Sequence, residues 1–202
     1  MKKLFIRICK LLGFEILDQN TFSSPTLEKK LNDELSIINE KSIILPLGKV
    51  KITKKISSIL IILRMNTEVE IWDQNKKRLF EQPKIEYSLR SINSLMNTIN
   101  FCQNKYPNLS IKTIIINDNS NEENLSRIKK LINSKDISIL NLDHKKFEKT
   151  IKPQKTRETF SNLASLMQSF EIGKDQGNDL VFFVEDDYLH FEPMLEEMVA
   201  SY

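Results

Sequence analysis

From residue 58 onward, short and mostly apolar runs alternate with stretches of amphipathic helical character, and this alternation constrains the fold more than any other feature. Each run is five or six residues long, which is typical of a strand buried on both faces. The runs are Ile59–Leu63, Ile111–Ile116, Ile137–Leu142 and Leu180–Val184. Strands that alternate with helices form a mostly parallel sheet flanked by helices, so we expect a Rossmann-like α/β fold.

Between the apolar runs, hydrophobic residues recur every three or four positions, as on one face of a helix. These helical stripes fall within residues 89–99, 125–132 and 160–170. Right-handed crossovers bring the carboxyl ends of parallel strands to one edge of the sheet, where open α/β folds bind ligands. The polar residues directly after each strand are therefore the candidates for a functional site.

The first 57 residues are expected to form a helical appendage to an α/β domain that spans residues 58–202. Within residues 1–17, apolar and basic side chains separate onto two faces of a helix. The apolar face holds Leu4, Phe5, Ile8, Leu11 and Leu12, and the basic face holds Lys3, Arg7 and Lys10. This helix either packs on its own domain or docks on an anionic membrane. Ser24-Pro25 opens a second helical pattern that should end near Lys41.

Charge and cysteine content exclude several classes of protein. The chain has 30 Lys and Arg against 27 Asp and Glu, a net charge of +3 that does not indicate a nucleic-acid partner. Cys9 and Cys102 lie far apart without metal-ligand spacing, which predicts reduced thiols and a cytoplasmic location. No apolar run reaches the roughly 18 residues that a spanning helix needs. We expect a soluble protein or one at the cytoplasmic face of a membrane.

Acidic residues follow two of the predicted strands. Asp118 stands in Asn117-Asp118-Asn119-Ser120, and the triplet Glu185-Asp186-Asp187 follows the last run directly. Ser120 and Glu123 have the spacing of a capping box, which leaves Asp118 without a capping role. Because both strands end at one edge of the sheet, we expect these carboxylates to converge on one crevice.

The acidic triplet suggests a metal site. Three adjacent carboxylates at the end of a buried strand repel one another, and this raises their pKa values unless a cation compensates. Such oxygen ligands suit Mn²⁺ or Mg²⁺, which usually bridge to substrate phosphates. The alternative is that the triplet belongs to the start of the helix at Phe191-Glu192-Pro193.

Two segments resemble motifs of the family 2 inverting glycosyltransferases, which have the GT-A fold. Ile114–Ser120 is similar to the second-strand motif V-D-D-(G/N)-S, with Asn117 in place of the first Asp. Phe182–Asp187 is similar to the fourth strand and D-x-D-like signature. The resemblance runs from Ile59 to the end of the sequence, and it implies a metal-dependent enzyme that transfers sugar from a UDP-sugar donor.

The resemblance also implies a role for individual residues. Asp118 would contact the base of the nucleotide, Asp187 would bind the metal, and Asp186 would approach the ribose or the metal. Glu185 would be the leading acid of the D-x-D spacing. Two basic residues are further candidates for nucleotide contact. Arg64 stands directly after the first strand, where the family shows a short polar turn, and Arg157 has a solvated side chain near a helix start as its alternative. The two histidines, His144 and His190, are expected to be ordinary surface residues, although His190 stands close enough to the acidic triplet to contribute to the site.

The acceptor and the general base stay unassigned, because in the family both come after the D-x-D strand. Only 15 of the 202 residues follow Asp187, so we expect a fold that is incomplete at its C-terminus and no acceptor transfer by this chain alone. Two alternatives stay open: a non-catalytic nucleotide-binding remnant, and another Mg²⁺- or Mn²⁺-dependent α/β protein such as a nucleotidyltransferase. The latter needs a glycine-rich loop after the first strand, where Arg64-Met65-Asn66 has none.

The polar stretch 67–87 separates the first strand from the first helix. It is much longer than the roughly 2 to 6 residues of most such connections. We interpret it as an insertion, a lid or a disordered segment, and it holds Trp72, the only tryptophan of the chain.

Overall fold

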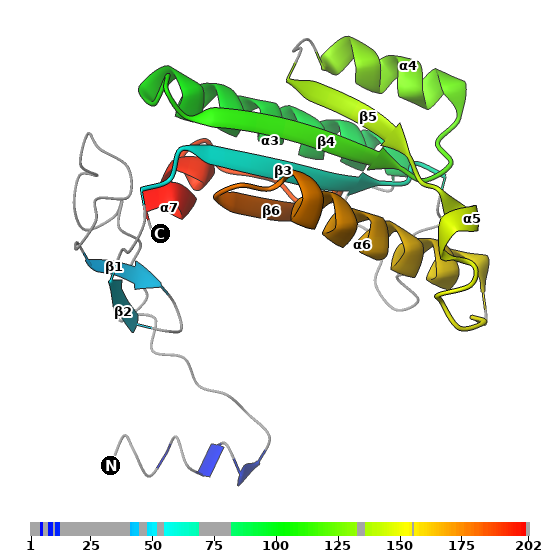
Figure 1. Cartoon of the computed structure of the whole chain (residues 1–202), viewed down its shortest axis with the longest axis horizontal. Helices are drawn as coiled ribbons and strands as arrows, with labels where there is room; N and C mark the ends of the chain where they lie inside the picture. The colour runs from blue at the N-terminus through cyan, green and yellow to red at the C-terminus, as the bar shows by residue number, and fades with distance from the viewer. Residues whose placement is uncertain are drawn as a thin grey trace.

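The structure is a computed structural model that describes residues 5, 8, 9, 11, 12, 41–44, 48–51, 55–68, 82–132, 136–154 and 156–200 (Figure 1). Its strands are β1 (Lys41–Ile44), β2 (Gly48–Lys51), β3 (Ser58–Met65), β4 (Ser110–Asn117), β5 (Ile137–Asn141) and β6 (Leu180–Glu185). Its helices are α3 (Lys84–Lys105), α4 (Glu122–Leu131), α5 (His144–Phe147), α6 (Arg157–Gln176) and α7 (Met194–Ala200).

Strands β3 to β6 form one parallel sheet in the order β5-β4-β3-β6. Ile61 at the centre of β3 pairs with Thr113 of β4 on one side and with Phe182 of β6 on the other. The chain moves outward from β3 to β4 and β5, and then returns to place β6 on the opposite side of β3. The expected α/β fold with a parallel sheet flanked by helices is therefore confirmed, and it is consistent with a Rossmann-like arrangement.

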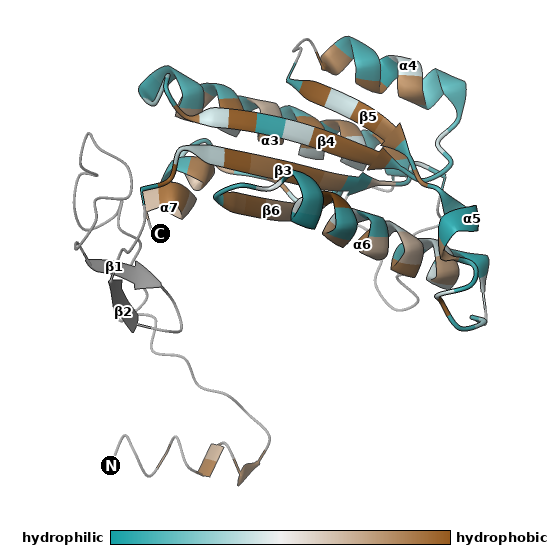
Figure 2. Ribbon diagram, viewed as in Figure 1, coloured by the Kyte–Doolittle hydropathy of each residue, from teal (hydrophilic) through white to brown (hydrophobic). Residues whose placement is uncertain are grey.

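Helices cover both faces of this sheet, and β3 supplies both cores because its side chains alternate between the faces. Ile61 and Leu63 pack in the core beneath α3, α4 and α7, whereas Leu60 and Ile62 pack in the core beneath α5 and α6. Figure 1 shows α6 in front of the sheet and α3 behind it, and Figure 2 shows β3 apolar along most of its length.

The expectation that all four strands are buried on both faces holds for β3 and β4 only. Leu140 of β5 is 39% exposed and Phe183 of β6 is 41% exposed. These two strands lie at the outside of the described sheet, where the flanking helices cover them less completely. An apolar run predicts a strand, but the position of that strand in the sheet decides how much of it is buried.

The helix that follows β3 begins earlier in the structure than the sequence pattern predicted. Helix α3 begins at Lys84 after Pro83, so residues 84–87 of the presumed insertion are helical. Proline is well suited to a helix start, because it has no backbone N–H to leave unpaired and its φ angle is already helical. Residues 69–81, which include Trp72, lie outside the described residues.

The N-terminal region contains a hairpin that the helical expectation missed. Strands β1 and β2 pair in antiparallel register from Lys41 opposite Lys51 to Ile44 opposite Gly48. The predicted helix after Ser24 lies outside the described residues. Among the described residues, no helix is both long and apolar enough to cross a lipid bilayer.

Candidate functional site

A pocket of about 520 Å³ opens at the carboxyl ends of β3 and β6. These strands are neighbours in the sheet, although β4 and β5 lie between them in the sequence, so the connections diverge at this point. Open α/β sheets bind ligands at such switch points, and the volume lies within the usual range for ligand pockets. The lining residues are Arg64, Met65, Asn66, Lys84, Asp118, Glu158, Thr159, Asn162, Ser165, Glu185, Asp186 and Asp187.

The pocket brings together Asp118, the acidic triplet and Arg64, which are five of the six residues that the sequence singled out for nucleotide or metal binding. The sixth, Arg157, is the first residue of α6; its side chain is exposed and does not line this pocket. Its neighbours Glu158 and Thr159 line the wall instead.

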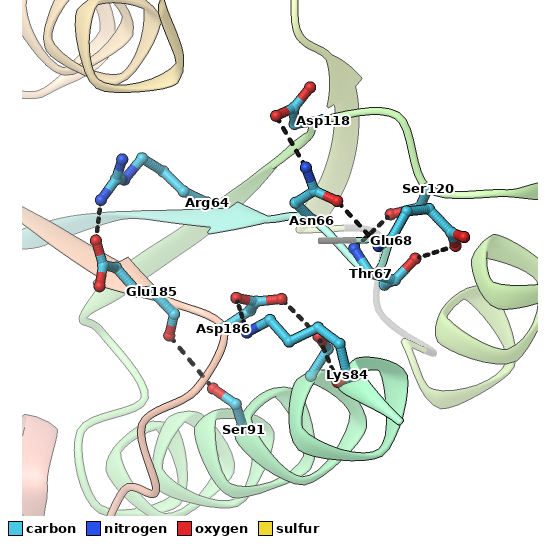
Figure 3. A network of polar contacts seen from close by, with 11 residues as sticks. Arg64, Asn66, Thr67, Glu68, Lys84, Ser91, Asp118, Ser120, Glu185 and Asp186 are labelled. Carbon is cyan, nitrogen blue, oxygen red and sulfur yellow. Dashed lines mark hydrogen bonds and ion pairs between the residues drawn. The ribbon is translucent and has the colours of Figure 1, made fainter. Parts of the chain in front are cut away.

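The carboxylates of Glu185 and Asp186 turn to opposite sides of the sheet, because consecutive residues of an extended chain alternate in direction. Glu185 forms an ion pair with Arg64 (Figure 3). Asp186 accepts hydrogen bonds from Lys84 Nζ at 2.7 Å and from Ser88 Oγ at 2.5 Å, both on α3. Two of the three carboxylates are thus each paired with a basic side chain of the protein, Glu185 with Arg64 and Asp186 with Lys84.

Arg64 connects three elements at the rim of the pocket. While it pairs with Glu185 of β6, its Nη1 donates to Asn162 Oδ1 at 2.7 Å and to Ser165 Oγ at 3.2 Å, both on α6. A guanidinium can do this because its planar fork presents several donors in fixed directions. Arg64 therefore fixes the end of β6 against β3 and α6.

Asp118 lies at the other end of the pocket and has partners of its own. Its Oδ2 accepts from Asn66 Nδ2 at 3.0 Å, and its Oδ1 lies 3.0 Å from His144 Nε2. The same His144 nitrogen lies 3.0 Å from Ser161 Oγ of α6. The expectation of an ordinary surface histidine was wrong for His144, because the start of α5 places it beside the end of β4.

The chain that leaves β3 is tied to the start of α4, and this holds Asn66 beside Asp118. Glu68 Oε1 accepts from Thr67 Oγ1 at 3.0 Å and from the side-chain amides of Asn121 and Asn124, each at 2.9 Å. The Thr67 hydroxyl is the main reason that the pKa of Glu68 lies below its ordinary value. A carboxylate at a helix N-terminus also faces the positive end of the helix dipole.

The cap of α4 differs from the predicted capping box. The N-cap is Asn121, whose side chain accepts from Asn124 N at 2.8 Å, and the helix begins at Glu122. Ser120 Oγ instead accepts from the backbone N–H of Thr67 at 3.3 Å. Asn and Ser are about equally good N-caps, so the sequence alone did not separate the two registers.

Asp187 is the one carboxylate of the triplet for which the described part of the structure shows no ion pair or hydrogen bond, and it is exposed at the pocket. No group of three or more His, Cys, Asp or Glu side chains among the described residues is arranged to hold a metal. One free carboxylate suits Mg²⁺ or Mn²⁺ held mostly by water and substrate phosphates, and it does not suit a closed protein cage. The donor set thus fits an ion that arrives with a phosphate ligand.

His190 lies just beyond the triplet and is also not an ordinary surface residue. Its Nε2 is buried without a hydrogen-bond partner in the described structure, and its ring lies edge-on to Phe182 at a centroid distance of 6.2 Å. Burial lowers the pKa of His190 below its ordinary value.

The sequence did not single out Lys84 or the α6 side chains that line the pocket. Pro83-Lys84 before the apolar stripe was a readable signal for a helix start at that position. Nothing in the local pattern indicated that Lys84 would face Asp186. The α6 residues Asn162 and Ser165 likewise resemble ordinary polar positions of an amphipathic helix.

The fold and pocket together define an α/β protein with a pocket at the switch point of a parallel sheet. Comparison with protein-family models and with curated protein sequences gave no match to this chain.

Proposed function

We propose that this chain binds the nucleotide of a sugar donor, a UDP-sugar, together with Mn²⁺ or Mg²⁺, as the donor-binding part of a GT-A type glycosyltransferase. The observation that carries the proposal is one pocket, at the switch point of a parallel sheet, which holds both Asp118 and Asp187. The acceptor of the sugar stays unassigned.

The charge of the pocket supports a cation as part of the ligand. Five acidic side chains and two basic ones, Arg64 and Lys84, line the pocket, which gives it a formal charge of −3. A diphosphate alone would be repelled by this field, whereas its complex with a divalent cation would be far less so. Asp187 is the residue we propose as the metal ligand, because Glu185 and Asp186 already hold Arg64 and Lys84.

The opposite end of the pocket supports recognition of the base. Asp118 and Asn66 together offer carboxylate and amide groups, which can accept from and donate to the polar edge of a base. Their mutual hydrogen bond of 3.0 Å holds the Asp118 carboxylate in a fixed orientation. In the proposed complex the base lies toward Asp118 and the diphosphate toward Asp187.

The proposed position of the diphosphate beside Asp187 determines how the pocket would assist transfer of the sugar. When bound, the divalent cation would offset the negative charge that develops on the departing diphosphate. Arg64 and Lys84 hold Glu185 and Asp186 in place at the end of β6, and this keeps the adjacent Asp187 in a defined position. The wall formed by α6 limits the room for the sugar.

Calorimetric titration of the full chain with UDP tests the proposal. We expect at least roughly tenfold tighter binding with Mn²⁺ than with a chelator present, in the range typical of one charge-assisted contact. Asp187→Ala should remove that difference. Glu192→Ala is the matched control, because Glu192 is an exposed acid five positions further on that does not line the pocket. Equal UDP affinity with and without Mn²⁺ would contradict the metal-dependent proposal.

A second candidate is metal-independent nucleotide binding without sugar transfer. It is favoured by the pairing of Glu185 with Arg64 and of Asp186 with Lys84, which neutralises two of the three carboxylates without a metal. In that case UDP affinity would not respond to Mn²⁺ or to Asp187→Ala, yet it would fall on Asp118→Ala. The same titrations therefore distinguish the two candidates.

A further inference from the structure

The apolar stripe near the N-terminus is exposed. Phe5, Ile8, Cys9 and Leu11 are α-helical, and Leu12 N donates to Ile8 O at 3.1 Å. The exposed fractions of the apolar residues are 61% for Phe5, 47% for Ile8, 87% for Leu11 and 68% for Leu12. Among the described residues, none of the four belongs to either core of the sheet domain. Of the two sequence-based alternatives, the exposure of these side chains favours docking on a membrane over packing on the same domain.

The four exposed side chains lie within one narrow sector of the helix. At about 100° per residue, Phe5, Ile8, Leu11 and Leu12 fall within an arc of roughly 120°. An isolated apolar residue at a protein surface is ordinary, but four on one helical face form a continuous surface that favours contact with another apolar phase.

The charge of the same segment indicates that this apolar phase is an anionic lipid membrane. Residues 1–14 contain four basic side chains, Lys2, Lys3, Arg7 and Lys10, and no acidic one. On the same helical wheel, three of them lie opposite the apolar arc: Lys3, Arg7 and Lys10. A short apolar stripe binds lipid only weakly by itself, and stable binding needs a second attraction, such as basic residues near anionic headgroups.

We propose that the exposed apolar face formed by Phe5, Ile8, Leu11 and Leu12 is an anchor that lies in the surface of an anionic lipid membrane, with these side chains toward the acyl chains. The basic side chains then lie at the level of the headgroups. This contact is peripheral, because the helical stripe is far shorter than the roughly 20 residues of a membrane-spanning helix. It is independent of the nucleotide pocket, so either proposal can fail without the other.

Flotation of the full chain with lipid vesicles tests the anchor. We expect binding to vesicles of phosphatidylcholine mixed with phosphatidylglycerol, little binding to phosphatidylcholine alone, and weaker binding as salt is added. The double variant Phe5→Ser with Leu11→Ser should lower the partition coefficient by roughly tenfold or more. The double variant Arg7→Gln with Lys10→Gln should lower it to a similar extent.

Two control variants match these changes on the body of the protein. Phe170→Ser removes an aromatic side chain of α6 that is 57% exposed, close to the exposure of Phe5. Lys129→Gln with Lys130→Gln removes two exposed charges in the last turn of α4. Both controls should bind anionic vesicles as the unchanged chain does, and circular dichroism should show the same secondary structure for all variants.

Three results would overturn the anchor. The first is that the full chain does not float with anionic vesicles. The second is that Phe5→Ser with Leu11→Ser binds as strongly as the unchanged chain. The third is that a solution dimer, measured by light scattering, dissociates in this variant while vesicle binding is absent; the stripe would then be an interface between copies of the chain.

Discussion

Lys84 and Asp186 form a buried ion pair whose side chains are only 13% and 9% exposed. Two charges in such a place have lost most of their hydration, so their mutual attraction mainly repays the cost of burying them. Removing one partner should therefore lower the free energy of unfolding much more than removing both.

We predict that Lys84→Met lowers the free energy of unfolding by about 3 kcal/mol, because it leaves the Asp186 carboxylate buried without a cation. Adding Asp186→Asn to this variant should restore much of the loss. Lys146→Met is the control, since its pair with Glu171 is 54% and 44% exposed, so solvent screens the attraction and its loss should change the free energy of unfolding far less. Urea denaturation measures all three. Equal losses for Lys84→Met and Lys146→Met would contradict a buried pair.

His190 should make the protein sensitive to acid. Burial lowers its pKa from the ordinary value of 6.5, so below that pH the unfolded chain binds more protons than the folded chain. The free energy of unfolding therefore falls as the pH drops from 6.5 through the lowered pKa. We predict that His190→Phe, which keeps an aromatic ring beside Phe182, reduces this fall. Denaturation at a series of pH values measures it, and an unchanged pH profile in the variant would show that His190 is not its source.

At the scale of elements, α6 and β6 meet through two glycines. Gly173 on α6 and Gly177 at its C-terminal cap face Val181, and a side chain at Gly177 would place Cβ 2.3 Å from Val181 Cγ2 and 2.5 Å from the Gly173 carbonyl oxygen. The backbone of Gly177 has φ −77° and ψ 134°, which any residue adopts. Space, and not conformation, requires glycine here.

Gly177→Ala should therefore lower the free energy of unfolding by about 2 kcal/mol, because the helix end or β6 must move to admit the methyl group. Lys174→Ala in the last turn of the same helix is the control and should change it by less than about 0.5 kcal/mol, since that side chain is exposed. Thermal or urea denaturation measures both. A neutral Gly177→Ala would mean that the α6–β6 contact is looser than described.

Elements were easier to predict from the sequence than their ends. The apolar runs and helical stripes located the four strands of the sheet, as well as α3, α4 and α6, because periodicity is a local property of the chain. The start of α3 at Lys84 was missed although Pro83 marks it. The cap of α4 at Asn121 was missed because Asn121 and the adjacent Ser120 have similar capping ability. The β1–β2 hairpin was not predicted, although the turn-forming residues Pro46 and Gly48 lie in the sequence where the chain reverses.

At the scale of the whole molecule, β3 is the strand on which the sheet depends. It pairs with β4 and with β6, and Ile61, Ile62 and Leu63 are fully buried between the two cores. The outer strands β5 and β6 each have one pairing partner in the described sheet and expose part of their side chains. The stability of the sheet domain should decrease outward from its centre.

Native-state hydrogen exchange tests this gradient. We predict that the amides of residues 60–63 in β3 and 114–116 in β4 exchange slowest, at rates set by global unfolding, because no smaller opening exposes them. The amides of β5 should exchange faster through local opening. Exchange in β5 as slow as in β3 would contradict the prediction and indicate a single cooperative unit.

The sequence by itself determined the four strands of the parallel sheet, the long helices α3, α4 and α6, and the edge of the sheet at which Asp118 and the acidic triplet would meet. Burial patterns are local, and parallel crossovers send all carboxyl ends to the same edge. Only the tertiary structure decided what each carboxylate contacts. Glu185 meets Arg64 from 121 positions away, and Asp186 meets Lys84 from 102 positions away. No local pattern encodes such pairs, because they arise where β6 lies beside β3 under α3, and they leave Asp187 facing the pocket.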